Sequence, residues 1–230
     1  MEQIDDSKLE QYYENEGLKF ALNDYYIGIY QMYSSHACRI AIIKKWLKHI
    51  KNGNFCDIGC GFGYFTHHVA RRGIQCVGID ISENKLKIAR KIAEKEGLNC
   101  KFYKMDIHNL NFKDNYFKWT LCSQVLEHVK DDIKVLKEIY RITKNYAVIT
   151  VPKKAIFWDL LDRSSGIRDF DTIGHGHFRE YRSIDIINKV KNIGFKILRI
   201  KFAGFISPRV DLIFSKIPFM QAIVCLLLRK

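Results

Sequence analysis

Apolar and polar residues follow one another along this chain in two periods, one typical of strands and one typical of helices. Short apolar runs predict strands near residues 54–58, 75–80, 99–104, 117–122 and 145–151. Between these runs, apolar residues recur every three or four positions and predict helices near residues 63–72, 82–96 and 132–142. Because strands that alternate with amphipathic helices form a parallel sheet covered on both faces, we expect a doubly wound α/β fold.

The C-terminal part of the chain continues this pattern. Residues 183–193 are expected to be helical up to Gly194, and residues 195–202 to form a strand. The apolar run at 222–228 is shorter than the roughly 20 residues of a transmembrane helix, and its length leaves a further strand and a membrane anchor as the two interpretations. Residues 205–219 allow an amphipathic helix that touches a membrane or roofs an apolar ligand.

The chain divides into an N-terminal extension and one larger domain. In residues 1–51 apolar residues recur at helical spacing, and we expect a helical lid across the open edge of the sheet. Residues 52–230 suffice for one domain, and a chain of this size buries roughly 70% of its unfolded surface. Within that domain, residues 153–181 show no clear period, and a long irregular segment in a compact domain is usually functional or mobile.

A glycine-rich turn holds the most informative chemistry. Residues 54–63, NFCDIGCGFG, combine a buried strand with a turn onto a helix. Glycine allows positive φ and a close approach of a ligand to the backbone, while the helix start presents unpaired N–H groups. The next strand ends in Asp80, and a carboxylate at that position can accept hydrogen bonds from both hydroxyls of a ribose. We therefore expect a ligand that contains ribose.

The order of the glycines distinguishes two kinds of nucleotide site. The dinucleotide fingerprint has its third glycine where this chain has Tyr64. The order found here, G-x-G-x-G after Cys56-Asp57-Ile58, resembles the first motif of the class I S-adenosylmethionine-dependent methyltransferases. Further segments resemble later motifs of that family in the same order, and these are residues 78–82, 104–107, 121–129 and 176–181.

The resemblance implies a fold, a cosubstrate and a reaction. The fold would be a Rossmann-like, seven-stranded, mostly parallel sheet with helices on both faces and an antiparallel last strand. The cosubstrate would be S-adenosylmethionine, and the product S-adenosylhomocysteine. The enzyme would transfer a methyl group to an oxygen, carbon or nitrogen of a small molecule, as quinone-biosynthesis-type methyltransferases do, with residues 153–181 as an insertion on the acceptor side. Proximity and orientation can supply about 7–11 kcal/mol of such a barrier.

The resemblance also assigns roles around the glycine-rich turn. Asp57 would fix the turn and receive the amino group of the methionine part. Asp80 would hold the ribose hydroxyls, with Ile81 against the adenine. The backbone beside the methionine part would come from Gly59, Cys60, Gly61 and Gly63.

Two later segments would complete the cosubstrate site. Asp106 would accept a hydrogen bond from the adenine amino group while Ile107 packs on the ring. Ser123 and Gln124, after the fourth strand, would line the floor beneath the reactive methyl. The alternative for Asp57 and Asp106 is a role in turn formation alone, but carboxylates that end successive apolar strands favour a ligand site.

Histidines are the candidates for a general base, which a hydroxyl acceptor needs. His128 and His177 belong to segments expected at the carboxyl ends of the strands, where ligands bind in such sheets. The alternatives are a helix-start residue for His128 and a loop anchor for His177. His67 and His68 lie on the first helix of the sheet domain and are interpreted as structural or exposed. No carboxylate set near His177 suggests a metal, and we expect none.

Composition bears on partners and location. The formal net charge is +13 and the isoelectric point about 9.4, which favours an anionic partner such as nucleic acid or a membrane surface. The lysines are nevertheless spread over many predicted helices, as in a chain with a general lysine bias. Seven cysteines form no C-x-x-C pair, and the acidic N-terminus differs from a secretory signal, so we expect a cytoplasmic location.

Several functions stay open at this stage. The leading one acts on a small-molecule acceptor, which can be apolar or lipid-linked. An RNA methyltransferase is a second, although residues 123–126 replace the Asn/Asp-Pro-Pro-aromatic sequence of adenine- and amide-methylating relatives. A binding protein that holds S-adenosylmethionine without transferring its methyl, or an oxidoreductase of the same fold, is a third. The sequence indicates no oligomeric state.

Overall fold

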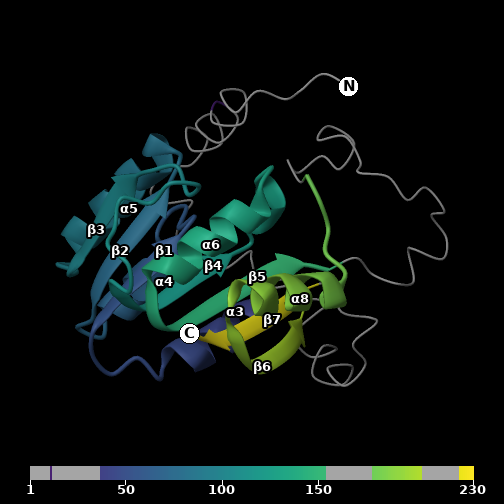
Figure 1. The fold of residues 1–230 in the computed structure, drawn as a ribbon. Coiled ribbons are helices and arrows are strands. Elements are labelled where there is room, and N and C mark those ends of the chain that lie inside the picture. Colours follow the sequence, from purple (N-terminus) through teal and green to yellow (C-terminus); the bar gives the residue numbers. More distant parts are fainter. Residues whose placement is uncertain (1–10, 12–36, 154–177, 204–222) are drawn as a thin grey trace.

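The computed structural model describes residue 11 and residues 37–153, 178–203 and 223–230. These residues build a seven-stranded sheet in the order β3-β2-β1-β4-β5-β7-β6 (Figure 1). The strands are β1 (Asn54–Ile58), β2 (Gln75–Asp80), β3 (Cys100–Lys104), β4 (Phe117–Ser123), β5 (Thr143–Pro152), β6 (Lys196–Ala203) and β7 (Ile223–Arg229). The helices are α3 (Ala37–Leu47), α4 (Tyr64–Ala70), α5 (Glu83–Lys95), η1 (Leu126–His128), α6 (Asp132–Ile142) and α8 (Ser183–Ile193).

Strand direction changes only at the C-terminal end of the sheet. The strands β3, β2, β1, β4 and β5 pair in parallel, whereas β7 lies between β5 and β6 and runs antiparallel to both. In the register, Ile58 of β1 pairs with Ile79 of β2 and with Cys122 of β4. The carboxyl ends of these three strands therefore meet at one edge of the sheet. The Rossmann-like fold with an antiparallel last strand is confirmed.

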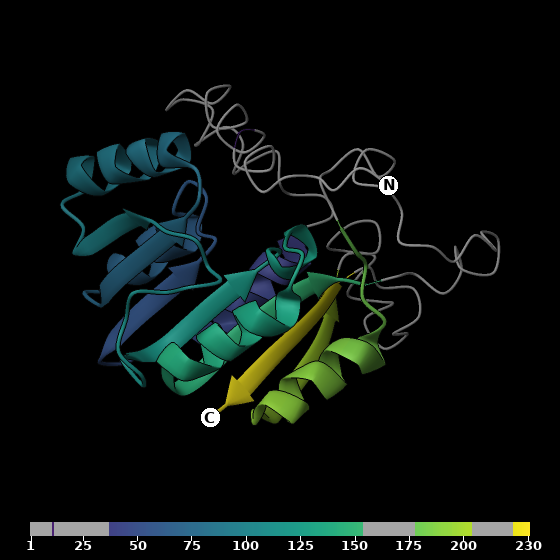
Figure 2. The same cartoon turned by 45° about the horizontal axis from the view of Figure 1, so that its top comes forward.

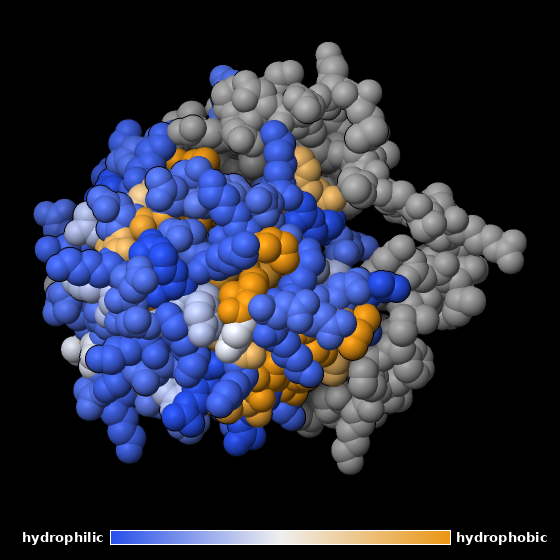
Figure 3. All heavy atoms as spheres, in the orientation of Figure 1, coloured by the Kyte–Doolittle hydropathy of each residue, from blue (hydrophilic) through white to orange (hydrophobic). Residues whose placement is uncertain are grey.

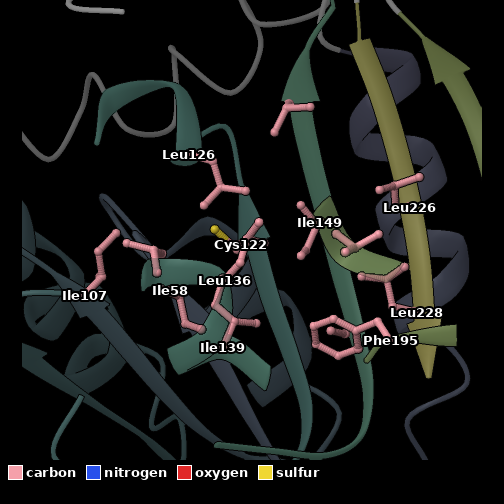
Figure 4. Close-up of a cluster of buried hydrophobic side chains, with 14 of the residues drawn as sticks. Ile58, Ile107, Cys122, Leu126, Leu136, Ile139, Ile149, Phe195, Leu226 and Leu228 are labelled. Carbon is pink, nitrogen blue, oxygen red and sulfur yellow. The ribbon is translucent and has the colours of Figure 1, made fainter. Parts of the chain in front are cut away.

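Helices cover the sheet on both faces (Figure 2). Neighbouring strand residues point to opposite sides, so Leu121 packs with α3 and α4 while Cys122 packs with α6 and α8. Figure 4 shows the second cluster, in which Leu136 and Ile139 of α6 lie over the sheet. Each fully buried aliphatic side chain contributes about 1.5–3 kcal/mol, and this two-sided burial explains why the strands read as continuous apolar runs.

Helix α5 has a specific residue at each of its two ends. The Ser82 hydroxyl accepts a hydrogen bond from the Lys85 amide at 3.3 Å, which makes Ser82 the N-cap. At the other end, Gly97 takes a φ of +61°, and this left-handed residue stops the helix. The elements predicted from periodicity match the observed ones to within about two residues, the usual spread of helix and strand ends.

Part of the predicted N-terminal lid lies within the described residues. Helix α3 packs on a face of the sheet against β7 and β6, with Ile43, Trp46 and Leu47 buried there. It therefore belongs to the same packed core as the strands. The predictions for residues 1–10, 12–36, 154–177 and 205–219 lie outside the described residues.

The coloured part of the face in Figure 3 is mostly hydrophilic. On the face shown, hydrophobic residues gather over α8 and β6, where Ile184, Leu198 and Ile200 are exposed. Within the described ranges, no helix has both the length and the apolar character that crossing a membrane requires.

Candidate active site

The turn after β1 is the centre of the site. Gly59 and Gly61 take positive φ values of 70° and 54°, which side chains rarely adopt. A Cβ on Gly59 would lie 2.3 Å from Val125, whereas a Cβ on Gly61 would meet nothing within 4 Å. The Cys60 amide donates to the carbonyl of Ile79 at 2.8 Å and so attaches the turn to β2. Gly59 is thus required by packing, while Gly61 faces open space in which a ligand has room.

Asp57 fixes the start of α4. Its carboxylate is 2% exposed and accepts hydrogen bonds from the Thr66 amide at 3.2 Å and the Thr66 hydroxyl at 2.9 Å. Burial raises the pKa of Asp57 to about 7, and the two bonds from Thr66 oppose that rise. The structure therefore shows how Asp57 holds the turn. Its contact with an amino group stays a prediction.

Asp80 connects the turn to the second strand. Its Oδ2 accepts from the Gly61 amide at 2.7 Å, and its Oδ1 accepts from the Ser82 amide at 3.0 Å. An ionised carboxylate has about four acceptor positions, so the two bonds leave capacity for two further donors. Ile81, the next residue, is half-buried. The geometry suits a ribose above Gly61, with Ile81 at its side.

Asp106 follows the end of β3. It is exposed and accepts from the amide and the ring Nδ1 of His108, at 2.9 and 2.7 Å. Partial burial raises the pKa of Asp106, but the hydrogen bonds from His108 outweigh it, and the net shift is downward. Ile107 is buried in the core beneath. Asp106 is thus held as a carboxylate at the same edge of the sheet as Asp80.

The end of β4 brings further polar groups to this edge. The Ser123 hydroxyl lies 2.6 Å from Nη1 of Arg39 and 3.0 Å from the hydroxyl of Thr150. Gln124 takes a positive φ of 59°, which costs a residue with a side chain roughly 1–2 kcal/mol. The backbone amide of Gln124 donates to the carbonyl of Thr150 at 2.9 Å. Strained residues of this kind cluster at ligand sites.

Three polar residues near this edge were not among the site residues that the sequence predicted. They are Thr66, Arg39 and Glu127. A signal for Arg39 existed, because it lies four residues before Ile43 on the buried side of α3. Glu127 is fully buried, which raises its pKa to about 8. No periodic signal marks Glu127, because a 3₁₀ helix of three residues is too short to show a repeating apolar side.

The histidines occupy different environments. His128 is half-buried in η1, and its amide donates to the carbonyl of Val125 at 2.9 Å. His177 lies outside the described residues, but the Phe178 amide donates to the carbonyl of Glu127 at 2.7 Å. His67 is fully buried, with Nε2 3.0 Å from the carbonyl of Ala89, so its structural interpretation is confirmed.

A known family covers the part of the chain that builds this edge. Residues 56–151 match the family described as a methyltransferase domain. These findings support the class I S-adenosylmethionine-dependent methyltransferase that the motifs resemble. The match includes the glycine-rich turn and the motifs at residues 78–82, 104–107 and 121–129, whereas the motif at residues 176–181 lies outside it.

Individual proteins match this chain over similar or shorter stretches. It is 40% identical over 104 residues to norajmaline N-methyltransferase of Rauvolfia serpentina, covering 44% of this chain and 36% of that enzyme. It is 30% identical over 115 residues to a ubiquinone biosynthesis O-methyltransferase of Coxiella burnetii, covering 50% and 46%. The matched segments thus span less than half of each relative.

A solved structure matches over the whole chain. Magnesium protoporphyrin IX methyltransferase from Synechocystis PCC 6803, solved with S-adenosylmethionine bound, superposes with a TM-score of 0.68. The superposition covers 100% of this chain and 99% of that one at 17% identity, a level that shows the fold alone.

Proposed function

We propose that this protein binds S-adenosylmethionine and transfers its methyl group to a small-molecule acceptor. The observation that carries the proposal is Asp80. Its carboxylate joins the Gly61 amide to the second strand and keeps acceptor capacity for two hydroxyls, within a chain of the methyltransferase family. A phosphate-bearing dinucleotide fits this edge less well, because Tyr64 stands where the third glycine of its fingerprint would be.

Residues at the carboxyl ends of different strands would bind different parts of S-adenosylmethionine. The turn of Gly59, Cys60, Gly61 and Gly63 would lie beside the methionine part, with Asp57 holding the turn in place. Asp106 would accept from the adenine amino group while Ile81 and Ile107 flank the ring. Ser123 and Gln124 would form the floor below the reacting carbon.

The chemistry needs little from the side chains. When bound, S-adenosylmethionine supplies a methyl group already activated by its positive sulfur. The protein's share is to hold the acceptor in line with that methyl and to exclude water, which can lower the barrier by about 7–11 kcal/mol. His128 and His177 are the proposed bases for an acceptor that must lose a proton. Replacing either with alanine should then lower turnover more than cosubstrate affinity.

Calorimetry tests the cosubstrate directly. S-adenosylmethionine and S-adenosylhomocysteine should both bind the full chain, whereas NAD should not. If only NAD binds, an oxidoreductase replaces the methyltransferase. If both adenosyl ligands bind but no methyl is ever transferred, the chain is a binding protein.

The acceptor can be sought with a labelled methyl group. Incubation with methyl-labelled S-adenosylmethionine and a cell extract should place the label in small-molecule or lipid fractions. Label in the RNA fraction instead would identify the second candidate, which the charge of +13 supports. A reducing, cytoplasmic compartment for this reaction is part of the proposal, because the seven cysteines of the sequence form no C-x-x-C pair.

A further inference from the structure

Four neighbouring elements carry basic side chains and no acidic ones. They are α3, α4, β6 and β7, and α3 packs against both of these strands. None of the four contains an aspartate or a glutamate, and neither do residues 48–53 and 71–74, which follow the two helices. The exposed cations of these segments are Lys45, Lys48, Lys51, Arg71, Arg72, Lys196, Arg199, Lys201 and Arg229. We call this part of the molecule the basic surface.

The ends of α3 and α4 bring several of these cations close together. The guanidinium of Arg72 donates to backbone carbonyls at the end of α3, among them that of Ile50 at 2.6 Å, and these neutral acceptors leave its charge uncompensated. Arg71 is paired with Glu96 at 2.7 Å. Burial and, after it, four nearby cations lower the pKa of His68 to about 4. These cations are Lys44, Lys48, Arg71 and Arg72. Because like charges repel at such separations, the arrangement favours a negatively charged partner.

A β-bulge aligns the cations of β6. The register with β7 shifts between Ile197 and Arg199, which leaves Leu198 as the extra residue. Because of this shift, Lys196 lies on the same side of the strand as Arg199 and Lys201, the side that faces α3. Strict alternation would have put Lys196 on the opposite side. Since β6 is the edge strand of the sheet, its three cations form a row beside α3.

Exposed apolar side chains lie next to this row. Leu198 is 47% exposed, Ile200 37% and Ile184 of α8 55%. Figure 3 shows hydrophobic residues gathered over α8 and β6. From residue 198 to residue 201 the exposed side chains of β6 are alternately apolar and basic. Apolar groups rimmed by cations are typical of a surface that lies on a membrane, where aliphatic side chains enter the acyl boundary and cations meet the headgroups.

RNA is the other polyanion that this charge can attract. Single-stranded RNA is bound largely by stacking its bases on aromatic rings. Among the residues that the structure describes, the exposed tyrosines are Tyr103 of β3 and Tyr116 before β4, and both lie outside the basic surface. The side chains exposed beside the cations of β6 are aliphatic instead. The observations therefore favour a lipid surface over RNA.

We propose that the basic surface docks on a membrane that carries anionic lipid headgroups. Its lysines and arginines bind the headgroups, and Leu198, Ile200 and Ile184 enter the boundary between the headgroups and the acyl chains. The surface uses none of the residues assigned to S-adenosylmethionine, so its test does not depend on the proposed function.

Sedimentation with vesicles tests the docking surface. The full chain should sediment with vesicles of equal parts phosphatidylcholine and phosphatidylglycerol, and should stay in solution with vesicles of phosphatidylcholine alone. A strand variant that combines three glutamine substitutions, Lys196→Gln, Arg199→Gln and Lys201→Gln, removes the row of cations on β6. At about fivefold for each cation, affinity for the anionic vesicles should fall about 100-fold.

A matched control removes the same charge elsewhere. It combines Lys113→Gln, Lys134→Gln and Lys137→Gln, at exposed positions before β4 and on α6, which lies on the other face of the sheet from α3. Because salt screens distant charges, affinity should change by less than about threefold. Equal vesicle affinities of the strand variant and its control would overturn the proposal, and so would equal binding to the two kinds of vesicle.

Two further variants complete the test. The combination of Lys45→Gln, Lys48→Gln and Lys51→Gln should cause a loss of similar size, and it replaces the strand variant if that variant does not fold. Leu198→Ser should lower by about threefold or more the vesicle binding that persists at high salt, where charge interactions are screened. Tighter binding of a single-stranded RNA that needs the same cations but not Leu198 would identify nucleic acid as the partner and refute the membrane.

Discussion

Replacing Asp80 with asparagine removes the charge of this carboxylate while keeping the shape of the side chain. In the structure, Oδ2 accepts from the Gly61 amide and Oδ1 from the Ser82 amide. The asparagine oxygen can keep one of these bonds, but its NH₂ group cannot accept the other. The same change leaves fewer acceptors for the two ribose hydroxyls.

The size of each effect follows from these bonds. A hydrogen bond to a charged group contributes about 1.5–3 kcal/mol, and 1.4 kcal/mol corresponds to tenfold in affinity. Losing one ribose bond should therefore weaken S-adenosylhomocysteine binding between about 10- and 100-fold. Losing one backbone bond at a half-buried residue should lower the free energy of unfolding by about 1–2 kcal/mol.

Calorimetry and urea unfolding measure the two quantities separately. Asp114→Asn is the matched control, because Asp114 lies before β4, at the opposite end of the sheet, with a side chain that is 69% exposed. Its ion pair with Arg141 should be worth less than about 1 kcal/mol, and ligand affinity should not change. An Asp80→Asn variant that binds S-adenosylhomocysteine as tightly as the unaltered chain would refute the ribose role.

Three further predictions concern buried polar groups. Burial raises the pKa of Glu127 from 4.5 to about 8, so the folded state binds more protons than the unfolded state between these pH values and stability falls as pH rises. Glu127→Gln should flatten the curve of unfolding free energy against pH in this window by up to about 1.4 kcal/mol per pH unit, and an unchanged curve would contradict the assignment. Thr66→Val removes the hydroxyl that donates to Asp57 and should lower the free energy of unfolding by about 1–3 kcal/mol in urea titrations. Tyr181→Phe removes the hydroxyl that donates to Asp132 at 2.7 Å, and should lower the melting temperature while S-adenosylhomocysteine affinity stays constant; a loss of affinity would instead connect Tyr181 to the site.

Most of the fold could be predicted because it depends on local signals. The strands around Phe55 and Leu121 are apolar on both faces, and α5 carries its own cap at Ser82 and stop at Gly97. The contact between Asp80 and the glycine-rich turn could also be expected, because Asp80 ends the strand next to that turn. These features are short-range, so a single sequence contains them.

The contacts between distant segments could not be predicted in the same way. Arg39 contacts Ser123 across 84 residues, and only the packing of α3 on the sheet brings them together. The position of β7 between β5 and β6 likewise depends on long-range pairing rather than on its apolar run. Helical spacing marks Arg39 as a residue on the buried side of α3, but it does not reveal that Ser123 is its partner.

The sequence by itself determined where the chain turns and which strands are buried on both faces. It also placed a carboxylate beside a glycine-rich turn. These features depend on backbone geometry and on the order of apolar and polar residues, which are properties of neighbouring residues. Only the tertiary structure decided which polar groups lose water. Desolvation of a group depends on the segments from distant parts of the chain that pack around it. The raised pKa values of Asp57 and Glu127 therefore follow from the packing of the helices on the sheet. The unpartnered Nε of Arg39 has the same origin.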